Sequence, residues 1–191
     1  MSPADIIPII DSKMTFDEAI AGTKAPKDII DSLRLIDVRY FAFDGRLHQG
    51  QLVVHSVVEK DVIEIFQLIE QLRFSVARVL PIVKYGWSDD KSMADNNTSA
   101  FNYRFVMGTE RFSHHAYGRA VDINPYLNPV IDESGHIDPP GATYLPDRPG
   151  TLFESHPVVR EFMSRGWRWG GKFSSSVDHH HFDKPNQPVR S

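Results

Sequence analysis

Residues 113–122 read SHHAYGRAVD, and residues 178–182 read DHHHF. These two short segments together contain five histidines and two aspartates. Two imidazoles and one carboxylate can hold a zinc ion with one coordination position left open, as catalytic zinc sites do. A further carboxylate close to such an ion can serve as a general base. The pattern therefore predicts a metal-dependent hydrolase.

The spacing of the first cluster is typical of neither a helix nor a simple strand. His115 and Asp122 lie seven positions apart, which suits a ligand in a loop, a tight turn at Gly118 and a second ligand on the strand that follows. Ala120 leaves the approach to the metal uncrowded. The chain has no cysteine, so any metal must be held by His, Asp and Glu. Imidazole ligands favour Zn²⁺ over Mg²⁺ or Ca²⁺, which prefer oxygen-rich shells.

The second cluster leaves the choice of histidine open. Strict strand alternation places His179 and His181 on one face and Asp178 with His180 on the other. If Asp178 is not a ligand, it can take a proton from water and pass it to a leaving amine. A surface run of histidines without metal is the competing interpretation. Two clusters that each contain an aspartate make it less favourable.

Composition limits the classes of function. With 41% hydrophobic and 24% charged residues, the 191-residue chain can bury one substantial core. A net charge of -4 gives no electrostatic reason to bind nucleic acid or an anionic membrane. No stretch approaches the ~20 apolar residues of a membrane span. Residues 1–10 lack the basic start and continuous apolar region of a signal peptide, and we expect a monomer.

Periodicity predicts a mixed α+β fold, with a small antiparallel sheet that carries the site on one face and has helices on its flanks. We expect strands over residues 33–43, 51–57, 76–85, 101–107 and 120–124, and a last strand within 167–182. We expect helices over 61–72, with Leu72 on the apolar face, and over 157–165; residues 87–99 and 128–149 read as loops. Residues 1–32 form an N-terminal segment that packs on the core, and residues 33–191 form a single catalytic domain.

The two motifs also resemble those of a known family. The patterns Ser113-x-His115-x-x-Gly118-x-Ala120-x-Asp122 and Asp178-x-x-His181-Phe182 look like those of the zinc D-alanyl-D-alanine peptidases of the M15 group. That group includes bacterial D,D-carboxypeptidases, D-Ala-D-Ala dipeptidases and phage L-alanyl-D-glutamate endolysins. Residues 92–102, 122–125 and 166–171 resemble an uncharacterised branch of the group. The resemblance extends from about Leu35 to Phe182.

This resemblance implies a role for each motif residue. His115, Asp122 and His181 are implied to bind one Zn²⁺ per chain, with Asp178 as the general base. The implied fold is that of the Hedgehog signalling domain and the D,D-peptidases, with zinc on the sheet face. Family members also use an arginine to stabilise the oxyanion or to hold the substrate. Lys84-Tyr85-Gly86 occupies its usual place, so Arg104 is our candidate.

The implied substrates are peptidoglycan stem peptides that contain D-amino acids. The implied activity is that of a D,D-carboxypeptidase or of a related L-Ala-D-Glu or D,D-endopeptidase, and substrate location implies a periplasmic or extracellular site of action. A zinc-binding module without catalysis is the alternative, which the retained acid at Asp178 disfavours. A structural domain that binds no metal is a third hypothesis.

Residues around the motifs have expected roles of their own. Ser113 and His114 either line the pocket or orient His115, and Asn124 can face the site because it shares a strand face with Asp122. Trp167 and Trp169 are expected to pack in the core. Asn96, Asn97 and Thr98 are expected to brace their loop.

Overall fold

The computed structural model describes residues 7–174 and 176–185. The α-helices are α1 (Phe16–Ala19), α2 (Lys27–Ser32), α3 (Glu59–Gln71), α4 (Asp89–Ala94) and α5 (Pro157–Ser164). The short 3-10 helices are η2 (Ser56–Val58), η3 (Ile82–Tyr85), η4 (His114–Tyr117) and η5 (Gly170–Lys172). The strands are β1 (Ile9–Ile10), β2 (Leu33–Phe41), β3 (Leu47–His55), β4 (Arg78–Val79), β5 (Asn97–Thr98), β6 (Ala120–Asp122), β7 (Val130–Asp132), β8 (Ile137–Asp138), β9 (Arg168–Trp169), β10 (Ser176–Asp178) and β11 (His181–Asp183).

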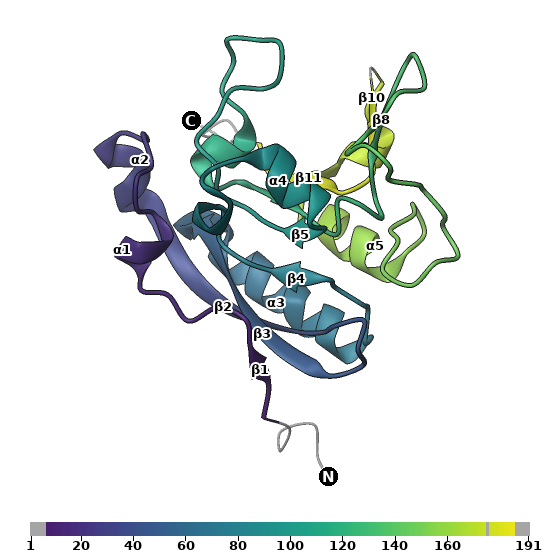
Figure 1. The fold of residues 1–191 in the computed structure, drawn as a ribbon, viewed down its shortest axis with the longest axis horizontal. Helices are drawn as coiled ribbons and strands as arrows, with labels where there is room; N and C mark the ends of the chain where they lie inside the picture. Colours follow the sequence, from purple (N-terminus) through teal and green to yellow (C-terminus); the bar gives the residue numbers. More distant parts are fainter. Residues whose placement is uncertain (1–6, 175, 186–191) are drawn as a thin grey trace.

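A long antiparallel hairpin, β2–β3, forms the base of the fold, and α3 lies along one face of it (Figure 1). The alternation predicted for β2 is confirmed, because Ile36, Val38 and Tyr40 are all buried. The apolar side chains of α3 at helical spacing meet them in the main core. Burying each large aliphatic or aromatic side chain is worth about 1.5–3 kcal/mol. This packing provides the rigid support for the second half of the chain.

The opposite face of the hairpin is covered by the N-terminal segment. Ala19 and Ala25 pack with Leu33, Val53 and Phe101 in a second apolar cluster. Helix α1 begins with a capping box in which the Thr15 side chain accepts from the backbone of Glu18. The division into residues 1–32 and 33–191 stays a prediction, and residues 1–6, 175 and 186–191 lie outside the described part of the chain.

Helix α5 connects the main core to the strands that carry the motifs. Phe162 on α5 stacks on Phe182 of β11, with ring centroids 3.9 Å apart and an interplanar angle of 14°. Phe162 also contacts the edge of Trp167. Phe182 has 0% of its surface exposed. Because Phe182 directly follows His181, this stack fixes the position of the second motif in the core.

The α+β class is confirmed, but the strands form several small sheets instead of one. Their orders are β1-β3-β2, β10-β7-β8, β6-β11-β9 and β4-β5. Most pairs are antiparallel, whereas β1–β3 and β4–β5 are parallel. Asp122 and His181 lie in the β6-β11-β9 sheet, Asp178 ends β10, and His115 lies on η4. Within the described residues, no helix has both the length and the apolar character needed to cross a membrane.

Several sequence-based boundaries are wrong. Residues 76–85 form only the short β4 and η3. Pro81, which has no N–H to donate to a neighbouring strand, is the residue before η3. The polar segment 87–99 contains α4, which Ser88 caps by accepting from Lys91 N, and the short β5. Residues 101–107 form no strand of the described sheets, and residues 128–149 include β7 and β8. Leu72 follows the last turn of α3 and is 44% exposed.

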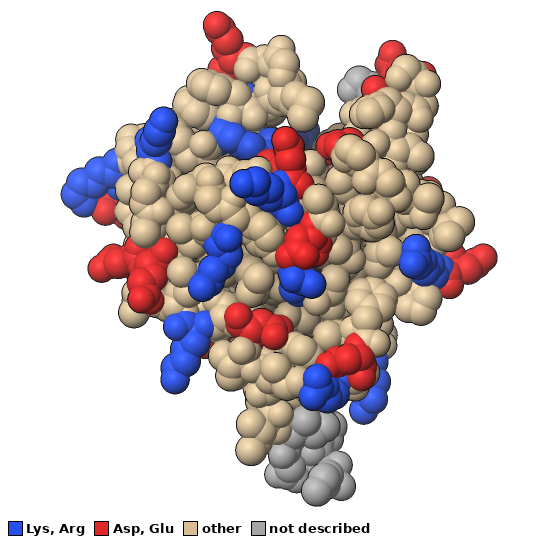
Figure 2. All heavy atoms as spheres, in the orientation of Figure 1, with Lys and Arg blue, Asp and Glu red and all other residues tan. Residues whose placement is uncertain are grey.

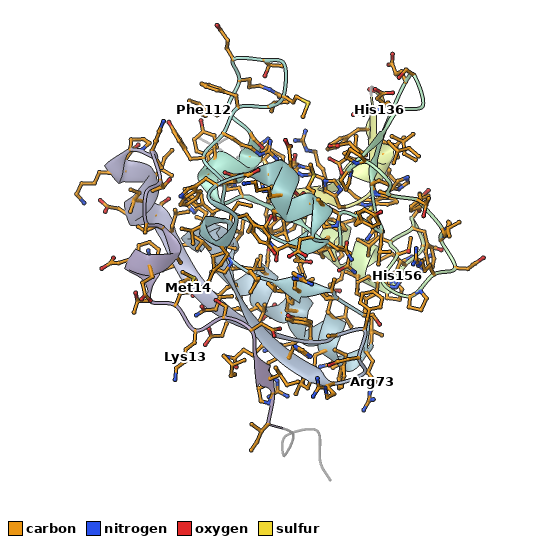
Figure 3. All side chains as sticks on the ribbon, viewed as in Figure 1. Lys13, Met14, Arg73, Phe112, His136 and His156 are labelled. Atoms are coloured by element: carbon orange, nitrogen blue, oxygen red, sulfur yellow. The ribbon has the colours of Figure 1, made fainter. Side chains whose placement is uncertain are left out.

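Two hairpins project from the same end of the molecule (Figure 1). The first, called here the 104–113 hairpin, is closed by Ser113 N donating to Arg104 O at 3.1 Å and Val106 N donating to Arg111 O at 2.8 Å. The second is β7–β8, where Val130 pairs with Asp138. Phe112 and His136, labelled in Figure 3, lie on the two projections. The surface between them is hollowed and carries charges of both signs (Figure 2).

Candidate metal centre and active site

His115 is held in place by the short helix η4. The side chain of Ser113 caps η4 by accepting from His115 N at 3.2 Å. Gly118 ends it with φ +65°, and a Cβ there would lie 2.7 Å from both His55 N and Leu33 Cδ2. Glycine is therefore required at position 118 both by the left-handed backbone and by the close approach to β3.

The His115 ring has its tautomer set by the backbone. Its Nδ1–H donates to the carbonyl of Ala100 in a short hydrogen bond. This bond leaves Nε2 free to act as a ligand, in the manner of most metal-binding histidines. Nε2 lies 3.0 Å from Asp122 Oδ2 and 3.2 Å from His181 Nδ1. The ring is almost completely buried.

Asp122 and His181 are brought together by strand pairing. They are direct partners in the antiparallel register of β6 and β11. Asp122 Oδ1 lies 2.9 Å from His181 Nδ1, and the carboxylate is 3% exposed. A one-residue slip of this register would turn one of the two side chains to the opposite face. The register therefore places two of the three predicted ligands side by side.

The three residues fit a zinc ion. One donor atom from each of His115, Asp122 and His181 lies within 4.8 Å of the others, and the closest pairs are 2.9–3.2 Å apart. Donor atoms at about 2.0–2.1 Å from a tetrahedral zinc lie about 3.3 Å from one another. Two imidazoles and one carboxylate also match the ligand types of catalytic zinc sites. The predicted ligands thus converge with both the chemistry and the spacing that this metal requires.

Electrostatics favour positive charge at the triad. Burial opposes ionisation of Asp122, but the charges and hydrogen bonds of the surrounding imidazoles hold the pKa of its carboxyl well below its usual range. Burial lowers the pKa of His181, but hydrogen bonds to Asp122 and Asp183 outweigh it and raise the pKa to about 10. The carboxylates around His181 thus favour positive charge at the triad.

Asp183 supports His181 on the side of the ring that faces away from Asp122, and the two motifs do not include it. Its Oδ2 lies 3.3 Å from His181 Nε2, while Arg168 donates to both of its oxygens at 2.7 Å. Burial raises the pKa of Asp183, but the hydrogen bonds from His181 and Arg168 overcome this effect and lower it. Carboxylates that accept from the second nitrogen of a ligand histidine orient the ring and increase its basicity. The available signal was an acid two positions after a ligand on the same strand.

Asp178 lies beside the triad but is not one of its three members. It ends β10, and the turn at 179–180 separates it from His181 on β11. Its Oδ1 lies 3.1 Å from His180 Nε2, and His180 donates from Nδ1 to Asn128 O at 2.7 Å. Asp178 lines the same cleft as the three ligands. This is the placement expected of a carboxylate that acts on water without binding the metal.

A cavity of about 550 Å³ opens over the triad. Arg104 lines it, with Nη2 2.7 Å from Asp89 Oδ2 at the start of α4. The guanidinium is thus held at the cleft wall by a carboxylate from another segment. Its role toward substrate stays a prediction.

The neighbouring residues occupy several distinct positions. Ser113 and His114 both line the cleft. Asn124 is fully buried and bonds to Ser75, Ala77 and Gly150, which directs its amide into a structural junction. Trp167 and Trp169 are buried in the main core, as predicted. Asn96, Asn97 and Thr98 brace their segment through hydrogen bonds to Tyr126, Leu80 and Asn124.

Comparison with known proteins agrees with this geometry. Residues 107–184 match the family model of D-alanyl-D-alanine carboxypeptidase. The match supports an M15-family peptidase. It contains both histidine motifs, while Arg104 lies just before it. The M15 peptidases are zinc enzymes, so the matched family and the His-Asp-His triad point to the same chemistry. No curated protein and no solved structure matches the chain.

Proposed function

We propose that the protein is a zinc-dependent D,D-carboxypeptidase that hydrolyses D-amino-acid-containing peptides of bacterial peptidoglycan. The observation that carries the proposal is the buried triad of His115, Asp122 and His181, with Asp178 outside it in the same cleft. The family match at residues 107–184 supports the substrate class. We further propose the Hedgehog/D,D-peptidase arrangement for the motif-bearing half and action outside the cytoplasmic membrane, where this substrate lies.

His115, Asp122 and His181 would hold the zinc. When bound, zinc supplies a Lewis acid that acidifies water and polarises a carbonyl group. Asp178 takes the proton from the attacking water and transfers it to the leaving amine. Arg104, fixed against Asp89, donates hydrogen bonds to the oxyanion that develops on the scissile carbonyl. The position of Asp178 outside the ligand set favours this catalytic role over a zinc-binding module without catalysis.

The test is digestion of defined muropeptides by the zinc-loaded protein, with the products identified by mass spectrometry. We expect release of a terminal D-alanine. Asp178→Asn should keep one zinc per chain and lower turnover by about 10²–10⁴-fold, the usual contribution of a general base. Asp147→Asn, at an exposed position away from the cleft, is the control and should behave as the wild type.

Each negative result has a distinct meaning. Wild-type turnover by Asp178→Asn would show that another group is the base. Failure of the zinc-loaded wild type to cleave any muropeptide would overturn the proposed activity. Well under one zinc per chain after reconstitution would overturn the metal site itself and favour a structural role.

A further inference from the structure

Four cationic side chains line the cleft over the triad, and three of them have a carboxylate partner. Arg104 contacts Asp89 at 2.7 Å, Arg168 contacts Asp183 at 2.7 Å, and Lys172 contacts Glu154 at 2.6 Å. The fourth is Arg111. Among residues 7–174 and 176–185, no carboxylate oxygen lies within 4.0 Å of its guanidinium. The charge of Arg111 is therefore available to a ligand.

The 104–113 hairpin directs Arg111 toward the cleft. Arg104, Val106, Arg111 and Ser113 all line the cavity. Between them, Phe105 and Phe112 form a bridge pair and stack on the other face of the hairpin, with ring centroids 4.3 Å apart. Tyr103 stacks on Phe112 at 4.8 Å. This stacked aromatic face stabilises the conformation of the hairpin.

The hairpin places Arg111 on the cleft wall, farther along the chain from His115 than Ser113 is. Ser113 caps η4, which carries His115, and Arg111 lies two positions before Ser113 on the same side of an extended segment. Two extended residues span about 7 Å. A guanidinium on this wall therefore reaches groups that lie one or two residues from a peptide bond positioned at the triad.

We propose that Arg111 is a specificity-determining residue that binds a substrate carboxylate one or two residues from the scissile bond. The planar guanidinium matches a carboxylate with two parallel hydrogen bonds. Two sources share this chemistry, the C-terminal carboxylate of the peptide and the side-chain carboxylate of an acidic residue. The proposal rests on the proposed peptidase function and assigns part of its selectivity to a residue outside the histidine motifs.

The experiment compares matched substrates. One pair is a stem peptide that ends in D-Ala-D-Ala as the free acid and as the C-terminal amide. A second pair contains D-glutamate or its side-chain amide next to the scissile bond. We expect Arg111→Gln to lower kcat/KM about 10–100-fold for the acid of one pair, mainly through KM, because the variant loses a hydrogen bond to a charged group. The matching amide should be unaffected.

The controls separate selectivity from folding and from the peptidase function. Arg111→Lys should retain part of the preference for the acid, and Arg160→Gln, an exposed arginine on α5, should retain all of it. The pair that responds identifies the source of the carboxylate. An unchanged acid-to-amide ratio in Arg111→Gln for both pairs overturns the proposal. If the wild type cleaves nothing, the proposed function fails, and calorimetric binding of the acids and amides to wild type and Arg111→Gln decides the role of Arg111.

Discussion

Removing the carboxylate of Asp183 should weaken zinc binding without unfolding the protein. Asp183 is 2% exposed and accepts from His181 Nε2 at 3.3 Å, so it fixes which nitrogen of His181 faces the triad. Loss of such an outer carboxylate lowers metal affinity about 10–100-fold, which corresponds to about 1.4–2.8 kcal/mol. We expect Asp183→Asn at the lower end, because an amide oxygen still accepts from His181. Asp183→Ala should lie at the upper end.

The effect on folding should be smaller than the effect on zinc. Arg168 loses its partner in both variants, but its side chain is half-exposed and water can solvate the guanidinium. Arg168→Gln is the matched control. It removes the clamp on Asp183 while leaving the Asp183–His181 contact, so zinc affinity should fall less than tenfold.

Zinc affinity is measured by competition with a chromophoric chelator, and circular dichroism of the metal-free proteins reports the fold. Zinc affinity should decrease in the order wild type, Arg168→Gln, Asp183→Asn and Asp183→Ala. If a folded Asp183→Ala binds zinc within about twofold of wild type, Asp183 does not support His181 as argued. An affinity loss in Arg168→Gln as large as in Asp183→Ala would assign the effect to Arg168 instead.

Two further perturbations test how the chain positions the site. A Cβ at Gly170 would lie 2.5 Å from Asp178 O and 3.2 Å from His181 Cβ. Gly170→Ala should therefore cost about 1–3 kcal/mol in chemical denaturation and reduce turnover, and unchanged stability would contradict this crowding. His156 caps α5 by accepting from Val158 N, and burial lowers its pKa. The stability that the neutral His156 contributes is present above the unfolded pKa of about 6.5 and is lost as pH falls through the lower folded pKa. His156→Asn should therefore lose less stability than wild type between pH 7 and 5 in thermal melts. Equal losses in the two proteins would refute this.

The spacing of apolar residues predicted the elements whose structure depends on neighbouring residues in the sequence. The spacing of Val62, Ile65, Phe66 and Ile69 identified α3 because each of these side chains meets the core. The alternation at residues 101–107 is equally regular, but it produced no sheet strand. In the described structure its backbone has only isolated partners: Phe101 donates to Val53 O, Asn102 donates to His115 O, and Phe105 forms a bridge with Phe112 on the return of its own hairpin. Strand pairing depends on distant partners, and a pattern of alternation contains no information about them.

The sequence predicted the candidate ligands of the site but not the residues that support them. The motif resemblance selected His181, whereas alternation alone left the choice open. The reason is visible in the structure, since the turn at 179–180 breaks the strand between Asp178 and His181, and strict alternation does not extend across it. Asp183 left one weak sequence signal, an acid two positions after a ligand, but its supporting role becomes clear only from its contact with His181. The partner of Arg104 was also unpredictable, because Asp89 belongs to α4, a helix that its polar sequence concealed.

The structure places the candidate metal ligands and the proposed substrate-binding Arg111 on different parts of the fold. Asp122 and His181 are fixed by the β6–β11 register and by the packing of Phe182 in the core, so their geometry depends on the most buried part of the chain. Arg111 belongs to the 104–113 hairpin, which projects from one end of the molecule (Figure 1). Changes in the hairpin can alter selectivity at little cost to the triad. Zinc affinity and carboxylate preference should therefore respond to different mutations: Asp183 variants should change the first and leave the acid-to-amide ratio intact, and Arg111 variants should do the reverse.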